Sequence, residues 1–510
     1  RPVATLAAAA PSAEIRGVRT WSAEKPELYT LVVRKGADIR TRKVGFKEVR
    51  IEGNAILVNG RKIKFKGVNR HETNPENGRT VSVADMMRDL ELMKRYNIDT
   101  VRTSHYPDHH LWYDLCDRYG LYVVAEANVE GHEPRYGENG LGRHREWMHS
   151  IVERNERHVL FYRNHACVTM WSVGNETGHG DCFSRAIAKV REIDPSRPIH
   201  WERGNAEADV DSRMYPTIEW LEGRGQFGDA GNGEMKREDG GIGYADAVDH
   251  TPGKCAFLCE YAHAMGNALG NLEEYWQVFE SHDCLIGGCI WDWIDQALWK
   301  ETGKIDSSTG RRERFLAYGG DFDEEPNDGP FNCNGVIGPL RRVSAKLVEV
   351  GHVYRGLVVS RLSDGTFSLR NRFGFLNANA FDGKWSLLQN GEMVRCGTFD
   401  VPPVAPLSIG ALVLPSFEIK GEGEWLLNVE FVLKSDTQWA EKGWPVSRNQ
   451  VVLSGSTERP SAVGACCPNF EESKETLAAV VGRTRAVFSR RTGTLCELQM
   501  NGKVILRDPA

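Results

Sequence analysis

The sequence predicts a multi-domain α/β protein: a central TIM (β/α)8 barrel flanked by immunoglobulin-like β-sandwich domains. Between about residues 60 and 320, short apolar runs alternate with helical patterns, which is typical of a parallel sheet with crossover helices. After about residue 350 the sequence alternates polar and apolar residues between turn signals, as in an antiparallel sandwich. The 510 residues are also too many for one hydrophobic core.

Eight apolar runs are expected to form the barrel strands. They are residues 63–72, 99–107, 122–130, 168–176, 199–205, 209–216, 256–264 and 286–295. In the first linking helix, Ser82 is expected to be the N-cap with Asp85 three residues later, and apolar residues recur at helical spacing up to Met93. The same periodicity predicts helices over 146–162, 183–194 and 272–282. Eight β-then-α units indicate a TIM barrel, whose chemistry lies on the loops after the strands.

Changes in pattern set the predicted domain boundaries. Residues 1–46 are expected to end an immunoglobulin-like β domain, and residues 47–350 to form the barrel. Residues 351–460 are expected to form an immunoglobulin-like β-sandwich, and residues 461–510 to begin a large C-terminal β-sandwich. Both outer domains look incomplete, so the chain is expected to be truncated at both ends.

Composition excludes several classes of protein. The formal net charge is −6 and no basic stripe is present, so no nucleic-acid partner is expected. No run of about 18 apolar residues exists, which argues against a membrane-spanning helix. The twelve cysteines are scattered, several of them in apolar runs, and this favours free thiols in a reducing compartment, the cytoplasm.

Two glutamates are the strongest functional signal. Glu176 and Glu260 each follow a buried strand where a loop begins. A single glutamate at such a position is more often a solvated surface residue or an ion-pair partner. Here polar and aromatic residues surround both acids in the sequence: Trp171, Asn175, His179, Tyr261, His263, Trp291 and Trp293. Aromatic faces suit the C–H surfaces of sugars, and amides and imidazoles suit their hydroxyls, so we expect a sugar site.

A closed barrel would bring further candidates to the same mouth. Seven residues come at or just after the ends of seven different predicted strands: His71, His105, Glu130, Glu176, Tyr215, Glu260 and Trp291. The imidazoles of His71, His105 and His263 are candidates for hydroxyl contacts. Asp108, His109 and His110 are expected to be capping and surface residues rather than a metal cluster.

The two acids match the needs of a retaining glycosidase, in which the carboxyl groups lie about 5–5.5 Å apart. We predict that Glu176 is the acid/base and that Glu260 is the nucleophile. Asn175 is expected to bind the sugar 2-hydroxyl, and Tyr215 to hold Glu260. Glu130 and His132 could bind Mg²⁺ together with Glu176, or they could simply be polar loop residues.

Several long motifs resemble glycoside hydrolase family 2, and within it the large bacterial-type β-galactosidases: GVNRHE, WSVGNETGHG, LCEYAHAMGN and GGCIWDWIDQ. The resemblance covers the barrel and extends more weakly into both flanks. It implies the same roles for Glu176 and Glu260, and magnesium ligands at Glu130, His132 and Glu176. It also implies substrate contacts at His71, His105, Tyr215, His263, Trp291 and Asn334, and part of a Na⁺ site at Phe331 and Asn334.

Family members are about twice this long, and they form tetramers. The resemblance therefore implies a homo-oligomer when the protein is full length, but it leaves the sodium site and full activity of this chain open.

The favoured hypothesis is a retaining enzyme that cleaves terminal, lactose-like β-D-galactosides through a covalent galactosyl-enzyme intermediate. A β-glucuronidase or β-mannosidase of the same family is a close alternative. A metal-dependent amidohydrolase would need an H-x-H pair after the first strand, which this sequence lacks. A non-catalytic sugar-binding fragment is the third alternative.

Overall fold

The computed structural model describes residues 12, 14–132, 139–202, 204–230, 253–416, 419, 423–454 and 467–507. It divides the chain into two compact units. The first unit comprises Arg1–Glu418 and Leu426–Val451, and the second comprises Ile419–Trp425 and Val452–Ala510.

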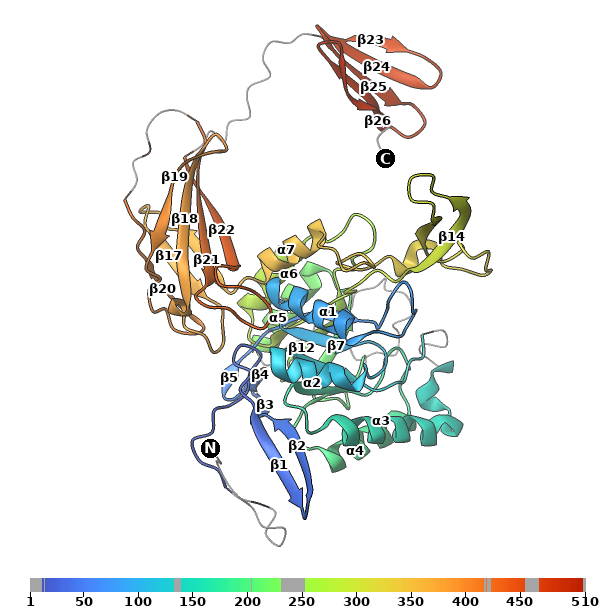
Figure 1. The fold of residues 1–510 in the computed structure, drawn as a ribbon, viewed down its shortest axis with the longest axis vertical. Coiled ribbons are helices and arrows are strands. Elements are labelled where there is room, and N and C mark those ends of the chain that lie inside the picture. Colours follow the sequence, from blue (N-terminus) through green and yellow to red (C-terminus); the bar gives the residue numbers. More distant parts are fainter. Residues whose placement is uncertain are drawn as a thin grey trace. The chain divides into compact units, whose positions relative to one another are not determined.

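An eight-stranded parallel barrel forms the centre of the first unit (Figure 1). Its strands are β6 (Phe65–Arg70), β7 (Thr100–Thr103), β8 (Tyr122–Glu126), β9 (Val168–Ser172), β10 (Ile199–His200), β11 (Asp211–Met214), β12 (Ala256–Tyr261) and β13 (Leu285–Ile290). They pair in the order β10-β9-β8-β7-β6-β13-β12-β11. A parallel bridge between His200 and Val210 brings the two ends of this sheet together. The predicted TIM barrel is confirmed.

Helices follow most of the strands and pack around them (Figure 1). They are α1 (Val83–Arg95), α2 (His110–Tyr119), α3 (Met148–Tyr162), α4 (Asp181–Ile193), α5 (Ile218–Ala230), α6 (Leu272–Ser281) and α7 (Ala345–Val353). The predicted cap of the first helix is confirmed. Ser82 Oγ accepts from the backbone N of Asp85, and the carboxylate of Asp85 accepts from the backbone N of Ser82. These reciprocal bonds satisfy two donors at the helix start.

Two connections differ from the predicted eight β-then-α units. No helix lies between β10 and β11 among the residues described there, so the prediction is wrong at this point. Instead, Gly204 N donates to Trp201 O in a turn, and the carboxylate of Asp209 accepts from Ile199 N at 2.8 Å. Because of these contacts, the chain between β10 and β11 forms a turn and rejoins the sheet without forming a helix. In addition, a hairpin of β14 (Leu298–Ile305) and β15 (Arg312–Ala317) lies between β13 and α7.

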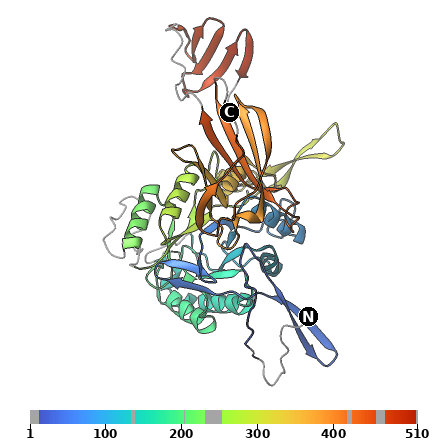
Figure 2. The same cartoon turned by 90° about the vertical axis from the view of Figure 1, so that its left-hand side faces the viewer.

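Smaller antiparallel sheets precede the barrel. β1 (Tyr29–Lys35) pairs with β2 (Asp38–Val44) in a hairpin that extends away from the barrel in both views (Figures 1 and 2). β3 (Val49–Glu52), β4 (Ala55–Val58) and β5 (Arg61–Lys62) form a second sheet. Short 3₁₀ turns also occur at η2 (Leu141–Arg143), η3 (Arg145–Trp147), η4 (Gly329–Asn332) and η5 (Ala378–Ala380).

Antiparallel strands follow the barrel, as the β-sandwich prediction requires. One sheet contains β16 (Leu357–Arg361), β17 (Phe367–Asn371) and β20 (Ser408–Leu412). The other contains β18 (Phe381–Gln389), β19 (Glu392–Phe399), β21 (Trp425–Leu433) and β22 (Pro445–Ser454). Buried and less buried residues alternate along β18 and β21, so each strand presents one face to a core. The predicted fold class is confirmed.

The second unit contains a five-stranded antiparallel meander. Its strands pair in chain order: β23 (Asn469–Glu472), β24 (Thr476–Val481), β25 (Thr484–Ser489), β26 (Leu495–Met500) and β27 (Lys503–Arg507).

Close packing shapes the barrel wall at Gly287 in β13. Its φ is +91°, and a Cβ atom there would lie 2.4 Å from the backbone oxygen of Phe65 in β6. Only glycine allows both this conformation and this approach. All the cysteines that the structure describes are free. No helix of the described residues is long and apolar enough to cross a membrane.

Candidate active site

Glu260 is the last residue but one of the buried strand β12, at the carboxyl end of the barrel, and two side chains hold its carboxylate. Tyr215 Oη donates to Oε2 at 2.8 Å, and Arg102 Nη1 donates to Oε1 at 3.0 Å. The backbone N of Tyr215 also donates to Glu260 O at 3.0 Å. Glu260 is only 5% exposed, so its carboxylate has little freedom to turn away from the barrel mouth.

Arg102 connects Glu260 to β6, to β8 and to the loop after β9, and it was not predicted from the sequence. Its guanidinium comes from β7 and is fully buried. It donates to Glu126 at 2.9 Å, to Asn69 at 2.9 Å and to Asn175 at 2.8 Å. A planar guanidinium offers five donors in a fixed fork, so one side chain can position several acceptors at once. The sequence did offer one signal for Arg102, because a charged residue inside a predicted barrel strand needs a buried partner.

Glu126, from β8, is the second buried charge of this network. His105 Nδ1 lies 2.7 Å from one carboxylate oxygen, and Ser172 Oγ donates to the other at 2.6 Å. Burial acts to raise the pKa of Glu126, but the charge of Arg102 and the hydrogen bond with His105 outweigh it and lower this pKa to about 2. Glu126 is therefore a fixed anion at neutral pH.

The anion orients the groups around it. Because Ser172 uses its only proton toward Glu126, Ser172 Oγ accepts from His200 Nδ1, 2.8 Å away. His200 Nε2 then accepts from Ser212 Oγ at 2.7 Å. Burial lowers the pKa of His105, although the contacts with Glu126 oppose this. A neutral His105 donates from Nδ1 to Glu126, which leaves Nε2 as an acceptor 3.7 Å from Glu260 Oε1.

Glu176 follows β9 with a left-handed backbone conformation, φ +44°. Such a conformation is uncommon for a residue other than glycine and is often found at functional sites. The residue before it, Asn175, is fixed at both ends of its amide. Its Oδ1 accepts from Arg102, and its Nδ2 donates to Glu130 Oε2 at 3.0 Å.

Glu130 and His132 lie beside Glu176. His132 Nε2 is 3.5 Å from Glu176 Oε2, and the backbone N of His132 donates to Glu130 Oε1 at 3.0 Å. Burial, together with the charge of Glu126, raises the pKa of Glu130 to about 8. Several carboxyl groups therefore crowd this side of the mouth, where a cation would be stabilised.

A neighbouring wall of the mouth consists of histidine and tryptophan. Asp292 Oδ2 lies 2.7 Å from His71 Nδ1 and orients that ring. His105 stacks on Trp291 with ring centres 5.3 Å apart, and His71 meets the edge of Trp291 at 5.2 Å. The two imidazoles are 5.9 Å apart. Apolar ring faces and oriented ring nitrogens thus lie side by side, as sugar binding requires.

His263 completes the wall near Glu260. Its ring lies 5.8 Å from that of Tyr215 and 5.8 Å from that of Phe331. Asn334 is nearby through the backbone, because its carbonyl accepts from Asp292 N at 2.8 Å. Asn334 is 3% exposed, and its Oδ1 has no hydrogen-bond partner among the described residues. A buried oxygen of this kind favours a bound cation or hydroxyl.

Electrostatic coupling links the two predicted acids. Burial raises the pKa of Glu260, and the charge of Glu176 raises it further. The contacts with Arg102, His105 and Tyr215 act to lower this pKa. Interaction between the two carboxyl groups is a property that catalytic pairs share.

Some sequence predictions need correction. Trp171, Tyr261 and Trp293 are core residues, because their polar atoms bind Asp194, Tyr354 and Asp89 respectively. Asp108 is neither a cap nor a surface residue. It is 1% exposed and accepts from Arg70 Nη1 at 2.8 Å, an ion pair that local sequence cannot reveal. His109 does cap α2, with Nδ1 accepting from Leu111 N.

One other group of described residues has metal-binding side chains close together: Asp117, His165 and Cys167. Asp117 already accepts from Cys167 N at 2.7 Å, and its other oxygen lies 2.9 Å from His165 Nδ1. Burial also holds the pKa of the Cys167 thiol well above its usual range. The group therefore acts as an anchor between α2 and the start of β9.

The barrel and the β-sandwich that follows it each match a known protein family. Residues 49–359 match the family model described as glycosyl hydrolases family 2, TIM barrel domain, and residues 367–454 match β-galactosidase, domain 4. The β-galactosidase of Priestia megaterium is 35% identical over 507 residues, which cover 94% of this chain and 46% of that protein. The β-galactosidase of Vibrio vulnificus strain CMCP6 is 36% identical over 510 residues, covering 96% and 47%.

The chain thus spans about half the length of the curated relatives it matches. Among solved structures, the family 2 β-galacturonidase from Eisenbergiella tayi bound to galacturonate is 22% identical with a TM-score of 0.49. That match covers 66% of this chain and 59% of the other.

Proposed function

Because the chain belongs to glycosyl hydrolase family 2, we propose that it hydrolyses terminal β-D-galactosides by double displacement with retention of configuration. The observation that carries this proposal is the arrangement of Glu260. Arg102 and Tyr215 fix its carboxylate at a barrel mouth where the charge of Glu176 also acts on it. The identity with two β-galactosidases supports the choice of sugar.

In the first step, a Glu260 oxygen attacks the anomeric carbon as the bond to the leaving oxygen breaks. Glu176, protonated at this stage, donates its proton to that oxygen. The product is a galactosyl ester of Glu260. Arg102 and Tyr215 favour this role because both stabilise the ionised form of Glu260 before attack.

In the second step, Glu176 is a carboxylate and removes a proton from water. The water oxygen attacks the anomeric carbon, and the bond to Glu260 breaks. Two inversions give net retention. Asn175 is suited to bind the 2-hydroxyl because Arg102 and Glu130 fix both ends of its amide. The neutral His105 and the Asp292-bound His71 offer oriented ring nitrogens to other hydroxyls.

We also propose that Glu130, His132 and Glu176 hold Mg²⁺. The carboxyl groups that crowd this side of the mouth fit a divalent cation, and so does the 3.5 Å approach of His132 to Glu176. When bound, the ion favours the ionised form of nearby carboxyl groups. The buried, unpartnered Oδ1 of Asn334 likewise supports a role, with Phe331, in binding Na⁺ or a sugar hydroxyl.

A panel of nitrophenyl glycosides tests the substrate. We expect kcat/KM for the β-D-galactoside to exceed that for the β-D-glucuronide and β-D-mannoside by at least about 100-fold, since hydrogen bonds to sugar hydroxyls discriminate strongly. A higher kcat/KM for the glucuronide or the mannoside would show that the protein is a β-glucuronidase or a β-mannosidase instead. Galactoside binding without turnover of any substrate would indicate a sugar-binding protein.

A further inference from the structure

A large cavity lies at the end of the barrel opposite Glu260. Its volume is about 970 Å³, the size of a pocket that holds a small organic molecule. It is lined by residues at the start of β6, β7 and β8 and by residues of the antiparallel strands β17 and β20. All of its lining residues belong to the first compact unit. The proposed catalytic residues take no part in it.

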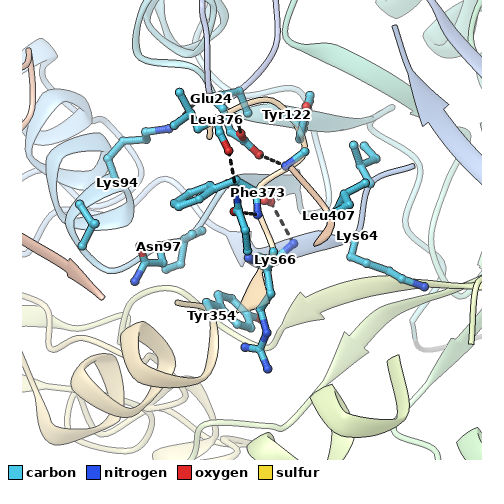
Figure 3. A pocket seen from close by; sticks show the side chains of 18 of the residues that line it. Glu24, Lys64, Lys66, Lys94, Asn97, Tyr122, Tyr354, Phe373, Leu376 and Leu407 are labelled. Carbon is cyan, nitrogen blue, oxygen red and sulfur yellow. Dashed lines mark hydrogen bonds between the residues drawn. The ribbon is translucent and has the colours of Figure 1, made fainter. Parts of the chain in front are cut away.

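Aromatic and basic side chains line this cavity together. Tyr122, Trp276, Tyr354 and Phe373 supply apolar surface. Seven of the lining residues are lysine or arginine, against five that are aspartate or glutamate. Figure 3 shows that Glu24, Lys66, Lys94 and Phe373 approach the same space from different segments. The lining therefore carries excess positive charge beside apolar surface.

The acidic residues of the lining are already bound by protein groups. Glu24 accepts from the backbone N of Gly374, Phe375 and Leu376 at 2.7–2.9 Å. Glu280 pairs with Arg370 and Arg372 at 3.2 and 2.6 Å.

The three remaining acids of the lining have partners too. Asp99 accepts from Lys66 N at 2.9 Å and from Thr100 Oγ1 at 2.6 Å. The exposed Asp283 pairs with Lys62, and Asp436 Oδ1 accepts from the backbone N of Lys442 at 2.7 Å.

Lys66 differs from the other lysines of the cavity. Lys62 pairs with Asp283, and Lys64 and Lys94 donate to backbone carbonyls. Among the described residues, the ammonium group of Lys66 makes no hydrogen bond or ion pair, although the residue is more than half buried. Burial lowers the pKa of Lys66, while the charge of Asp99 acts against this. A partly buried ammonium without a partner loses part of its hydration, and an anion beside it would offset that loss.

We propose that this cavity binds a small organic anion, with its apolar body among the aromatic residues and its charged group paired with Lys66. The site is separate from the proposed active site and does not depend on the sugar that the enzyme cleaves. Charge-assisted pairing with Lys66 supplies the specificity for an anion, and burial of the body supplies most of the affinity.

Two fluorescent probes of nearly equal shape test the proposal on the 510-residue chain. They are 8-anilinonaphthalene-1-sulfonate, an anion, and N-phenyl-1-naphthylamine, which is its neutral analogue. We expect Lys66→Met to weaken binding of the sulfonate by about 10- to 100-fold, as loss of a hydrogen bond to a charged group does. Binding of the neutral probe should change less than about threefold, because the apolar lining is kept.

Two further variants serve as controls. Lys66→Arg keeps the charge and should retain sulfonate binding. Lys384→Met removes an exposed lysine of β18 outside the cavity and should leave both affinities unchanged. Equal sulfonate affinity in Lys66→Met and the unaltered protein would overturn the proposal. Equal loss of both probes would also overturn it, because the effect would then not depend on the charge of the ligand.

A structure of the unaltered protein with the sulfonate probe gives a check that needs no variant. We expect the sulfonate within hydrogen-bond distance of Lys66 Nζ. A probe located only elsewhere on the protein contradicts the assignment.

Discussion

A single guanidinium organises the proposed catalytic residues. Arg102 binds Glu260, Asn175 and Glu126, and so connects the proposed nucleophile, a proposed 2-hydroxyl ligand and a buried anion. The positions of these three acceptors therefore depend on one another. A change at Arg102 should affect the ionisation of Glu260 and the orientation of Asn175 together.

The first prediction concerns that ionisation. Arg102 holds down the pKa of Glu260, and attack requires the ionised carboxylate. In Arg102→Met, the pKa of Glu260 should rise by about one to three units. The acidic limb of the kcat/KM profile should move to higher pH by the same amount, because a higher pH is then needed to deprotonate Glu260.

Arg102→Met also leaves the buried Glu126 without its cation, which should lower the free energy of unfolding by about 3–5 kcal/mol. The pH profile of kcat/KM should therefore be recorded at a temperature at which thermal unfolding shows that the variant is folded. Arg102→Lys keeps a charge and should show a smaller shift. Arg88→Met, on the solvent side of α1, is the matched control. An acidic limb that stays in place in Arg102→Met would refute this role of Arg102.

The second prediction concerns the proposed metal site. Glu130→Gln replaces one of the proposed carboxyl ligands by an amide, so the Mg²⁺ affinity measured by calorimetry should fall by at least about tenfold. Glu146→Gln changes an exposed glutamate of η3 and should have no effect. If both variants bind Mg²⁺ like the unaltered protein, the ion is not held at Glu130.

The sequence was sufficient to find residues that follow strands, but not residues inside them. Glu176, Glu260 and Trp291 come at strand ends, where the barrel rule places functional groups. Arg102 lies inside β7 and Glu126 is the last residue of β8, both in runs that look like core. Their roles depend on partners that are distant in sequence. The partnership of Asp108 with Arg70 was hidden for the same reason, since 38 residues separate them.

At the scale of elements, helix α3 carries a titratable group into the barrel wall. His158 is 4% exposed and packs against the edge of Trp171 in β9, with ring centres 5.3 Å apart. Burial lowers the pKa of His158 to about 4. The folded protein therefore resists protonation of this ring, whereas the unfolded chain takes up a proton near pH 6.5.

This gives a third prediction, about stability. The unfolded state binds more protons than the folded state between about pH 6.5 and 4, so stability should fall as the pH is lowered through this range. His158 should contribute about 3 kcal/mol to the fall, since each unit of pKa shift is worth about 1.4 kcal/mol. Urea unfolding at several pH values measures it.

His158→Gln should lose less stability on acidification than the unaltered protein does. His149→Gln changes an exposed histidine of the same helix and should leave the pH dependence as it was. The same slope in all three proteins would show that His158 is not the titrating group.

The elements found from sequence are the long or strongly periodic ones. The barrel strands and α1 follow from apolar runs and a capping box. The assumption of a helix after every strand failed between β10 and β11, although the predicted runs 199–205 and 209–216 left too little chain for one. The β14–β15 hairpin was missed because its strands are largely exposed, and an exposed strand lacks the apolar run that marks a core element.

At the scale of the whole molecule, the barrel makes one site from residues that are distant in sequence. His71 and Asn334 are separated by most of the barrel, yet both contact Asp292. The predicted domain boundaries and the predicted tetramer remain predictions. Sedimentation of a full-length relative and of this chain would show whether assembly requires the additional length.

The central claim is that Glu260 becomes covalently bound to the sugar. The most direct test is to incubate the protein with 2,4-dinitrophenyl 2-deoxy-2-fluoro-β-D-galactoside, digest it and identify the labelled peptide by mass spectrometry. We expect one fluorogalactosyl group, on Glu260, and none in Glu260→Gln, whereas Glu274→Gln on the exposed face of α6 should label normally. A label on a different residue, or turnover of galactosides that never yields an adduct, would contradict the mechanism.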